Sequence, residues 1–399
     1  MPSTRLKLLY VDVPFEREAG GDKNRSRFLW DALREEFDAS LGLTIDDSTR
    51  AALARHASVP SITGECRPAP WGRSQSIPAF DKRDREAFAR FVSGGGFDVV
   101  FSRFCVSWEL LKALQAASPR TKVIVDVDMV SSRLARLSWL SKRGFRNRWF
   151  LFEHWKLALF ERRLFCEPWL FLFTNPDELE WVRKQSAPPG GPGQFDWLPN
   201  IMPREESLSD VGREPVVLFF GALDSAANRD GFLFLLDEVF PLIKRALEEA
   251  GARIHVAGAN APPGFGERAR EVGNGRIVLL GRVDSMARTI ASSLFVLLPL
   301  RVASGTRTRI LEAGGAARAV VTTPIGAEGL GLGETVLIGT TARELADHTI
   351  RLLRDRDAAA TLGVQLKGRC QALYLPEAVA AKLCLRVRAF AAPQSAHEV

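Results

Sequence analysis

The sequence PLRVASGTRTRILEAGG at residues 299–315, followed by VVTTPIGAEGL at 320–330, decides the fold of this chain. An apolar strand, Leu294 to Leu298, runs into a loop of Gly, Ser and Thr residues. The next segment places Ile310, Leu311, Gly314 and Gly315 where they can pack one face of a helix on a sheet. The pattern therefore predicts a strand, a loop and a helix of a parallel α/β domain.

The loop at 304–309 carries groups that bind phosphate. Backbone N–H groups at Ser304, Gly305 and Thr306 and the positive end of the helix dipole favour an anion, and Arg307 and Arg309 add formal charge at the same end. Glu312 can reach a pair of sugar hydroxyls, because a carboxylate accepts two hydrogen bonds. These residues predict a sugar-nucleotide site. The alternative is a plain strand–helix unit with a solvated basic helix.

The same stretch resembles the C-terminal domain of the group 1 retaining glycosyltransferases of the GT-B fold. In that family a carboxylate and seven further residues precede a second Glu, which is followed by an Ala. Glu312 matches the second Glu, whereas Ser304 stands where the family has the first carboxylate, which usually contacts the donor hexose. A related branch of bacterial polysaccharide glycosyltransferases has a small residue there and reads Gly-Thr-Arg before Glu-Ala, close to 305–313 here.

Size and composition favour two domains in a reducing compartment. The chain has 399 residues, long for one core, and 46% of them are hydrophobic. There is no run of about 20 apolar residues and no signal-peptide core, so we expect a cytoplasmic protein that can lie peripherally on the inner membrane face. Five cysteines and five histidines are scattered. Neither a metal site nor a His-based nucleophile is expected.

Residues 133–163 carry the excess of positive charge. They contain nine Lys and Arg against two Glu, a difference of seven that equals the net charge of the whole chain. Aromatic residues such as Trp149, Trp155 and Phe160 lie among them. Rings mixed with cations are expected where a helix lies on an anionic bilayer. A solvated helix and a nucleic-acid surface are the alternatives, but no nucleic-acid recognition motif accompanies the charge.

Short apolar runs alternate with helical periods, which predicts parallel sheets. We expect an N-terminal acceptor-side domain at 1–203, a linker at 204–215, a C-terminal nucleotide-sugar-binding domain at 216–375, and a C-terminal helix and tail at 376–399. The strands expected are Leu6–Val13, Asp98–Ser102, Val123–Asp128, Trp169–Thr174, Val216–Gly221, Arg253–Ala257, Arg276–Leu280, Leu294–Leu298, Ala319–Thr322 and Thr335–Ile338. The resemblance implies two doubly wound domains facing each other across a cleft. The Pro/Gly run at 186–194 is expected to be a surface loop of the first domain.

Two further loops of the first domain are candidate sites. Gly20 and Gly21 follow the first strand and would let the backbone approach a ligand, with Arg25 as the contacting side chain. Asp126 and Asp128 have the spacing of residues that face one side of a strand. Taken alone, this spacing could suggest the Asp-x-Asp metal motif of the other large glycosyltransferase fold. We interpret both instead as cleft-lining residues near the acceptor or donor hexose.

The second domain offers more candidates at other strand ends. Gly221 and Asn228 resemble the family's first donor-domain loop, and Arg229 is a second candidate for the diphosphate. Arg282 and Val283 resemble the segment whose backbone reads the nucleobase. In the loop behind the donor site, Glu328 is expected to be structural.

The resemblance implies a retaining glycosyltransferase that moves a hexose from a nucleoside-diphosphate sugar to a hydroxyl of a glycan or a lipid-linked saccharide, as in polysaccharide or cell-envelope glycan synthesis. No cofactor and no metal is expected, and Arg229, Arg307, Arg309 and Asp128 are the candidate catalytic residues. The partners expected are the donor, the acceptor and an anionic membrane surface at 133–163, without nucleic acid. Alternatives are a GT-B-shaped binding or scaffolding protein without turnover, a basic nucleic-acid binder, and another enzyme of the same fold such as an epimerase.

Overall fold

The structure is a computed structural model that describes residues 5–12, 21–45, 61–63, 80, 82–103, 108–141, 148–185, 191–203 and 214–392. The chain forms two compact units. The first contains residues 1–199 together with 377–399, and the second contains residues 200–376. Gly20, residues 186–190 of the expected surface loop and residues 204–213 of the expected linker lie outside the described residues.

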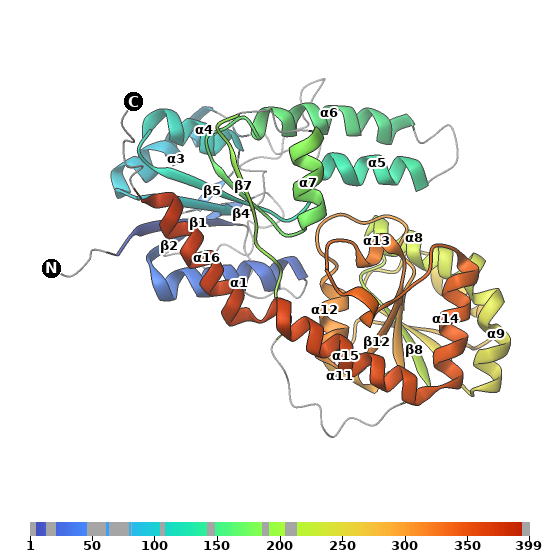
Figure 1. The fold of residues 1–399 in the computed structure, drawn as a ribbon. Helices are drawn as coiled ribbons and strands as arrows, with labels where there is room; N and C mark the ends of the chain where they lie inside the picture. Colours follow the sequence, from blue (N-terminus) through green and yellow to red (C-terminus); the bar gives the residue numbers. More distant parts are fainter. Residues whose placement is uncertain are drawn as a thin grey trace. The chain divides into compact units, whose positions relative to one another are not determined.

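The first unit is built on a seven-stranded parallel sheet with the order β3-β2-β1-β4-β5-β6-β7. Its elements are β1 (Lys7–Asp12), α1 (Gly21–Glu36), β2 (Asp38–Ile45), β3 (Ser61–Thr63), α3 (Lys82–Gly95), β4 (Val99–Arg103), α4 (Trp108–Ala117), β5 (Lys122–Val127), α5 (Ser131–Ser141), α6 (Arg148–Leu164), β6 (Leu170–Phe173), α7 (Pro176–Gln185), β7 (Gln194–Trp197) and α16 (Pro376–Ala391). Figure 1 shows α1 on one side of this sheet and α3 and α4 on the other.

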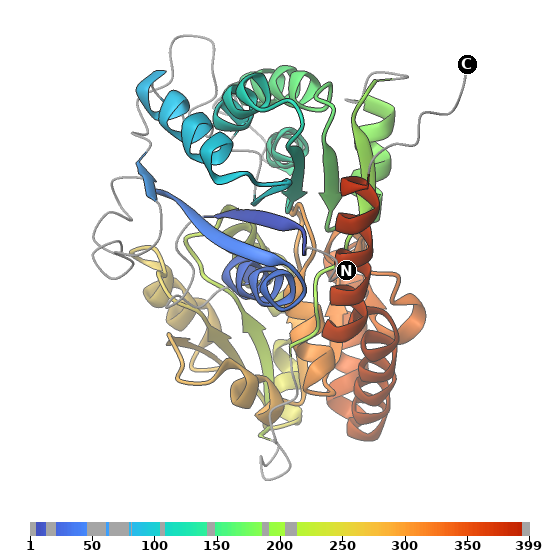
Figure 2. The ribbon, with the colours of Figure 1, turned by 90° about the vertical axis from the view of Figure 1, so that its left-hand side faces the viewer.

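Strands of the first unit are apolar on both faces because helices cover both. Successive side chains of a strand point to opposite faces, and every residue of β4 is buried. One face packs in a core that contains Val100, Val125 and Phe171. On the unit's surface α16 lies against α1 and β7, where Arg386 pairs with Asp196 at 2.5 Å. Figure 2 shows α16 in red beside this sheet. Continuous apolar runs of this kind are typical of parallel sheets.

The second unit has a six-stranded parallel sheet with the order β10-β9-β8-β11-β12-β13. Its elements are β8 (Val216–Phe220), α8 (Ala226–Phe234), the π-helical turn η3 (Leu235–Val239), α9 (Phe240–Glu249), β9 (Arg253–Ala257), α10 (Phe265–Gly273), β10 (Ile277–Gly281), α11 (Met286–Ser292), β11 (Phe295–Leu298), α12 (Thr308–Gly315), β12 (Ala319–Thr322), α13 (Pro324–Ala327), η4 (Gly333–Thr335), β13 (Leu337–Ile338), α14 (Ala342–Arg354) and α15 (Arg356–Tyr374).

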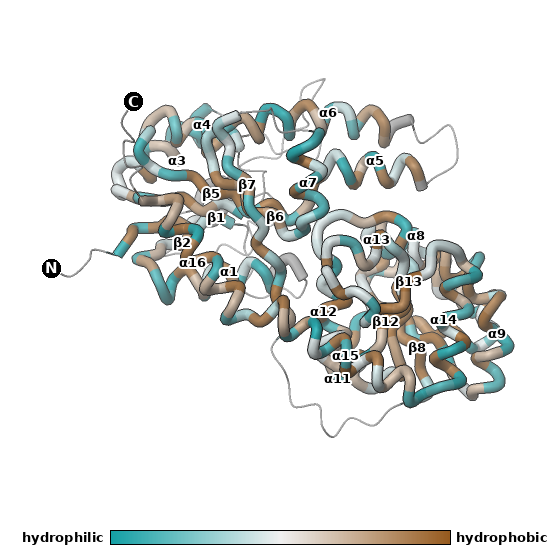
Figure 3. Tube along the Cα trace, viewed as in Figure 1, coloured by the Kyte–Doolittle hydropathy of each residue, from teal (hydrophilic) through white to brown (hydrophobic). Residues whose placement is uncertain are grey.

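Two separate cores fill the two faces of the second sheet. Val217 and Phe219 of β8 point into one core, whereas Leu218 and Phe220 point into the other. This alternation follows from the two-residue repeat of a strand. In Figure 3 the inner strands of the unit are largely brown, while the helices alternate between brown and teal. The helices therefore have one apolar face each, as amphipathic covering helices do.

Both sheets confirm the doubly wound α/β fold expected from the sequence. All ten expected strands are present, with ends that differ by at most two residues. Strands β2, β3 and β7 were not predicted from the sequence. The two edge strands of the first sheet are short, since β3 has three residues and β7 has four. β7 is also only partly buried. Edge strands of this kind lack the continuous apolar run by which the inner strands were predicted.

Candidate functional site

The candidate site lies where the strand order of the second sheet reverses. β8 has β9 on one side and β11 on the other, so the chain leaves the carboxyl ends of β8 and β11 in opposite directions. A crevice at such a switch point is where doubly wound sheets bind their ligands. Gly221 directly follows β8, and the loop at 299–307 follows β11. Both predicted loops therefore start at this point.

Gly221, Asn228 and Arg309 are brought together there. Gly221 has φ of +135°, and a Cβ at this position would lie 2.7 Å from Asn228 Nδ2 and 2.8 Å from an Arg309 terminal nitrogen. Arg309 donates to the carbonyl oxygen of Phe220 at 2.9 Å, and Asn228 Nδ2 donates to that of Ala222 at 2.7 Å. Only glycine fits this position, because a side chain would occupy the space of both polar groups.

Asn228 leaves one polar atom unused at this site. Its side chain is buried, and no hydrogen-bond donor reaches Oδ1 within the part of the chain that the structure describes. The bond from Nδ2 to Ala222 fixes the amide orientation, so Oδ1 is the free acceptor. A buried acceptor without a partner costs about 1–3 kcal/mol. Such an atom is expected where a ligand supplies the missing donor.

Burial shifts the pKa values of two neighbouring groups on α12. Burial lowers the pKa of Arg309 to about 10; Glu312 opposes this shift and the charge of Arg307 adds to it. Burial raises the pKa of Glu312, against the attraction of Arg309 and a hydrogen bond from Thr308. Arg309 therefore keeps its charge at neutral pH, but it is poorly solvated. An anion placed beside it would gain more than it would beside a solvated arginine.

The loop before α12 presents the predicted backbone groups. Gly305 is buried with φ of +71°, a conformation that glycine adopts readily. Ser304 and Thr306 flank it and are half-buried. α12 begins at Thr308 without a side-chain cap on its first turn. In its first turn the N–H groups of Thr308 and Ile310 donate to the carbonyl oxygens of Thr306 and Arg307. The positive end of the helix dipole at this turn still favours an anion.

Arg307 is engaged with the protein itself. Its guanidinium donates to the carbonyl oxygens of Gly305, Gly326 and Glu328. It also pairs with the Glu328 carboxylate at 3.2 Å, and the arginine side chain is 3% exposed. The pairing joins the loop after β11 to the loop after β12. The contact between Arg307 and Glu328 was not predicted, because nothing in the sequence pairs two residues that are 21 positions apart.

Arg229, Arg282 and Val283 lie at other edges of the same end of the sheet. Arg229 is half-buried in the second turn of α8. Arg282 is exposed and, with Gly281, borders a hollow of about 480 Å³ at the carboxyl ends of β8, β9 and β10. Leu223, Val256 and Leu279 line its apolar wall. Val283 is half-buried against the core. The hollow has the volume and the mixed lining of a small-molecule pocket.

Arg25 belongs to a buried network of the first unit. Its guanidinium pairs with Asp126 at 2.6 Å and donates to the carbonyl oxygens of Leu198 and Pro199. Arg103 also pairs with Asp126, which is fully buried. The two arginines lower the pKa of Asp126, although its burial acts in the opposite direction. The expectation that Asp126 lines a cleft is therefore wrong, because its carboxylate compensates two buried guanidinium groups.

Asp128 and Gly21 also lie in the first unit. Asp128 follows β5 and is half-buried, and its carbonyl oxygen accepts from Thr174 Oγ1 at 2.9 Å. Gly21 is the first residue of α1. Asp126 and Asp128 both raise the pKa of Arg103, against the effect of its burial, so the two carboxylates lie near the same guanidinium. They differ in burial, because Asp126 is fully buried and Asp128 is half-buried.

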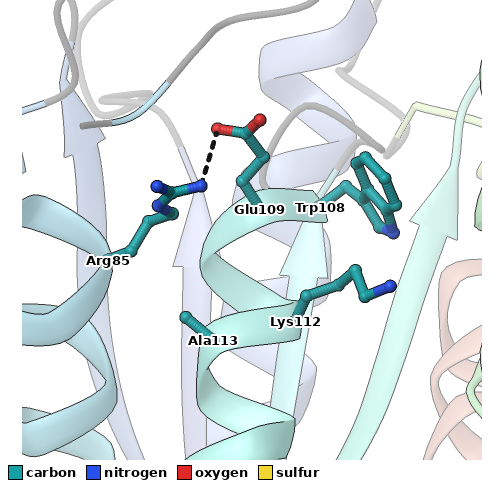
Figure 4. Close-up of a pocket in the computed structure, with 5 residues that line it drawn as sticks. All are labelled: Arg85, Trp108, Glu109, Lys112 and Ala113. Atoms are coloured by element: carbon teal, nitrogen blue, oxygen red, sulfur yellow. Dashed lines mark ion pairs between the residues drawn. The ribbon is translucent and has the colours of Figure 1, made fainter. Parts of the chain in front are cut away.

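A second hollow, of about 360 Å³, lies between α3 and α4 of the first unit. Figure 4 shows Arg85 reaching toward Glu109, while Trp108 and Lys112 extend to the other side. The Arg85–Glu109 pair measures 3.8 Å, and Lys112 pairs with Glu167 at 2.9 Å. Its cations are each matched by a carboxylate. An anionic ligand is therefore less favoured here than beside Arg309.

The described residues include no group of three or more His, Cys, Asp or Glu side chains that could hold a metal ion. None of the helices in those same residues is long and apolar enough to cross a membrane.

Residues 214–355 match a family model described as glycosyl transferases group 1. This match covers 142 of the 399 residues, all of them in the second unit. The likeness indicates a glycosyltransferase that uses a nucleotide-sugar donor. The matched segment contains Gly221, Asn228, Arg309 and Glu312, all on the second unit.

Solved structures of low sequence identity share the GT-B fold of this chain. One is Alr3699/HepE from Anabaena in complex with UDP and glucose, with 14% identity, a TM-score of 0.64, and coverage of 96% of this chain and 100% of that chain. Another is sucrose-phosphate synthase from Thermosynechococcus elongatus, with 16% identity, a TM-score of 0.60, and coverage of 96% and 99%. None of the curated proteins matches the chain.

A trehalose 6-phosphate synthase from Burkholderia multivorans is similar to this chain in the same way. Its identity is 11%, its TM-score is 0.63, and the match covers 97% of each chain. At such identities the likeness is one of backbone. The particular residues of the donor site must therefore be assigned from the geometry of this chain.

Proposed function

We propose that this glycosyltransferase transfers a hexose, with retention at the anomeric carbon, from a nucleoside-diphosphate sugar bound to the second unit. The observation that carries the proposal is the convergence of Gly221, Asn228 and Arg309 at the switch point. A diphosphate and its attached sugar suit this site. Gly221 lets the backbone come close to the ligand, Asn228 Oδ1 is a buried acceptor, and Arg309 is a poorly solvated cation. The hollow beside Gly281 has room for the nucleobase.

In the proposed mechanism, catalysis is mainly electrostatic. The bond from the anomeric carbon to the phosphate oxygen breaks, and the bond to the acceptor oxygen forms on the same face. The acceptor hydroxyl gives its proton to the departing phosphate oxygen. Arg309 and Arg229, with the amides of Gly305 and Thr306, stabilise the charge that develops on the diphosphate. Glu312 accepts from a pair of sugar hydroxyls.

The buried contacts of two predicted arginines suggest positioning roles. Arg307 holds the loops after β11 and β12 together through Glu328, and thereby fixes the amides of Gly305 and Thr306. Arg25 fixes the start of α1, which begins at Gly21, to the Leu198–Pro199 backbone. We propose that Ser304 lies beside the hexose, although it offers a hydroxyl where the family has a carboxylate. Asp128 is the candidate contact to a sugar on the first unit.

The acceptor we propose is a hydroxyl of a glycan or a lipid-linked saccharide, in polysaccharide or cell-envelope glycan synthesis, with an anionic membrane surface as the partner of residues 133–163. We propose that the reaction needs no metal, because the cationic side chains of the second unit can take its place at the diphosphate. The exposed side chains of Phe152 and Trp155 in the basic segment support the membrane partner.

The test is release of nucleoside diphosphate from UDP-, GDP- and ADP-hexoses, with the anomeric configuration of the product read by NMR coupling constants. Loss of one such electrostatic contact typically costs about 10²–10³ in rate, which is expected for Arg309→Met. Arg245→Met is the matched control, because Arg245 is exposed on α9 and pairs only with Glu249 among the described residues. Full activity of Arg309→Met, or an inverted product, would contradict the proposal.

A further inference from the structure

The outward face of α6 is apolar where a solvent-facing helix is normally polar. Leu151, Phe152, Trp155 and Leu159 are 44%, 46%, 58% and 41% exposed. Buried residues Glu153, Leu157, Glu161 and Leu164 occupy the other side of the same helix. At about 100° per residue, the four exposed apolar positions fall within roughly a third of the helix circumference. They therefore form one continuous stripe, which we call the α6 stripe.

Basic residues continue the α6 stripe toward the end of the helix. Arg162 and Arg163 are exposed and fall within the same third of the circumference. α5, which lies beside α6, adds the exposed Arg136 and Leu140 (Figure 1). The acidic residues of the described parts of both helices, Glu153 and Glu161, are buried. All the exposed formal charge on these two helices is therefore positive.

The aromatic side chains of the stripe are held in place before any partner arrives. The rings of Phe152 and Trp155 stack with their centroids 6.4 Å apart. The Lys156 ammonium lies 4.3 Å from the centre of the Phe152 ring and pairs with Glu153 at 3.3 Å. Ordered side chains lose little conformational freedom when they are covered. A stable exposed pair of this kind suits insertion into an interface.

We propose that the α6 stripe inserts into the headgroup region of an anionic bilayer, with Arg162 and Arg163 against lipid phosphates. An apolar stripe bordered by cations is the arrangement of interfacial helices. A second copy of the chain that covered the stripe with its own would bring like charges together, so charge complementarity favours the lipid surface. This inference rests on the proposed function for its partner and assigns the side chains that enter the membrane.

The experiment is sedimentation of the full chain, without nucleotide, with vesicles of phosphatidylcholine alone or mixed with phosphatidylglycerol. Wild type should bind only the mixed vesicles, and a rise from 0.1 to 0.5 M NaCl should weaken the binding, because salt screens the cationic contribution. Phe152→Ser with Trp155→Ser should lower the partition coefficient by about tenfold or more, because burial of large apolar side chains drives insertion.

The matched control is Val364→Ser with Leu385→Ser, which removes two apolar side chains that are 64% and 63% exposed on α15 and α16. This variant should bind as wild type. Both double variants should keep the thermal midpoint of wild type, so a folding defect is recognised directly. Donor binding in solution should be equal in all three proteins, so failure of membrane binding and failure of the donor site are distinguishable.

Three results would overturn the inference. The first is unchanged vesicle binding by the Phe152 and Trp155 variant. The second is equal binding to neutral and anionic vesicles. The third is a dimer of wild type, seen by sedimentation velocity, that this variant dissociates, since the stripe would then be an interface between copies.

Discussion

The guanidinium of Arg309, on α12, donates to the main-chain carbonyl of Phe220, the last residue of β8, across 2.9 Å. This bond joins the two strand–helix connections that leave the sheet in opposite directions at the switch point. It also fixes a cation beside the Gly221 turn, where burial lowers its pKa to about 10. One side chain thus shapes the backbone of the site and supplies its charge.

Gly221→Ala should damage the donor site and the fold together. The new methyl group would meet Asn228 Nδ2 at 2.7 Å and Arg309 at 2.8 Å, at a φ of +135° that alanine rarely adopts. We expect a loss of about 2 kcal/mol in the free energy of unfolding, measured in urea. Gly266→Ala in α10 is the control, since an added Cβ there meets nothing within 4 Å. It should be neutral or stabilising, and equal losses in both would contradict this account.

Arg307→Met should lower stability and reduce donor affinity indirectly. It removes a buried guanidinium from three carbonyl oxygens and from Glu328, a carboxylate that is partly exposed. We expect about 2–4 kcal/mol in the free energy of unfolding. The double variant Arg307→Met with Glu328→Gln should recover part of that loss, because the unpaired charge is gone. No recovery in a double-mutant cycle would show that the two residues do not act as a pair.

Arg25→Met should destabilise the first unit without changing nucleotide binding. It leaves Asp126 with one of its two guanidinium partners in a fully buried place. Breaking such a pair costs about 3–5 kcal/mol. Urea unfolding measures this loss, and nucleotide affinity is measured by calorimetry well below the midpoint. A drop in affinity at full stability would instead restore the direct ligand contact expected from the sequence.

Glu161 should make the stability of the first unit pH-dependent. Burial raises its pKa to about 7, although Ser132 donates two hydrogen bonds to it. Because the folded pKa exceeds the unfolded one, its contribution is present below pH 4.5 and is lost as the pH rises through about 7. At about 1.4 kcal/mol per pKa unit, the loss is on the order of 3 kcal/mol. Glu161→Gln should flatten the difference between urea midpoints at pH 5 and 8. An unchanged pH dependence in this variant would exclude Glu161 as its source.

The inner strands and the loops that end them could be predicted because apolar runs and glycine pairs are local signals. Val216–Phe220 followed by Gly221 is one such signal, and the structure has both where they were expected. β2 was missed because it forms by pairing with β1, and β3 because it forms by pairing with β2. The sequences DASLGLTI and SIT do not reveal these pairings by themselves.

Pairings between distant charges could not be predicted. The partners of Arg25, Arg103 and Asp126 come from α1, β4 and β5, and Arg307 meets Glu328 across two loops. Sequence assigns an arginine its charge but not its neighbour, so buried structural arginines and ligand-binding arginines look alike. A charged residue that ends an apolar strand, as Arg103 ends VVFSR, is a signal that could have suggested burial.

The most direct test of the central claim is thermal stabilisation by UDP, GDP, ADP and their hexose conjugates, with and without EDTA, on wild type and on Glu312→Ala. Ligand at a hundredfold excess over Kd adds about 2.7 kcal/mol to the stability of the native state. We predict that one base stabilises wild type selectively, that EDTA changes nothing, and that Glu312→Ala, folded as well as wild type, loses the effect. Stabilisation by none of these nucleotides would contradict a donor site on the second unit.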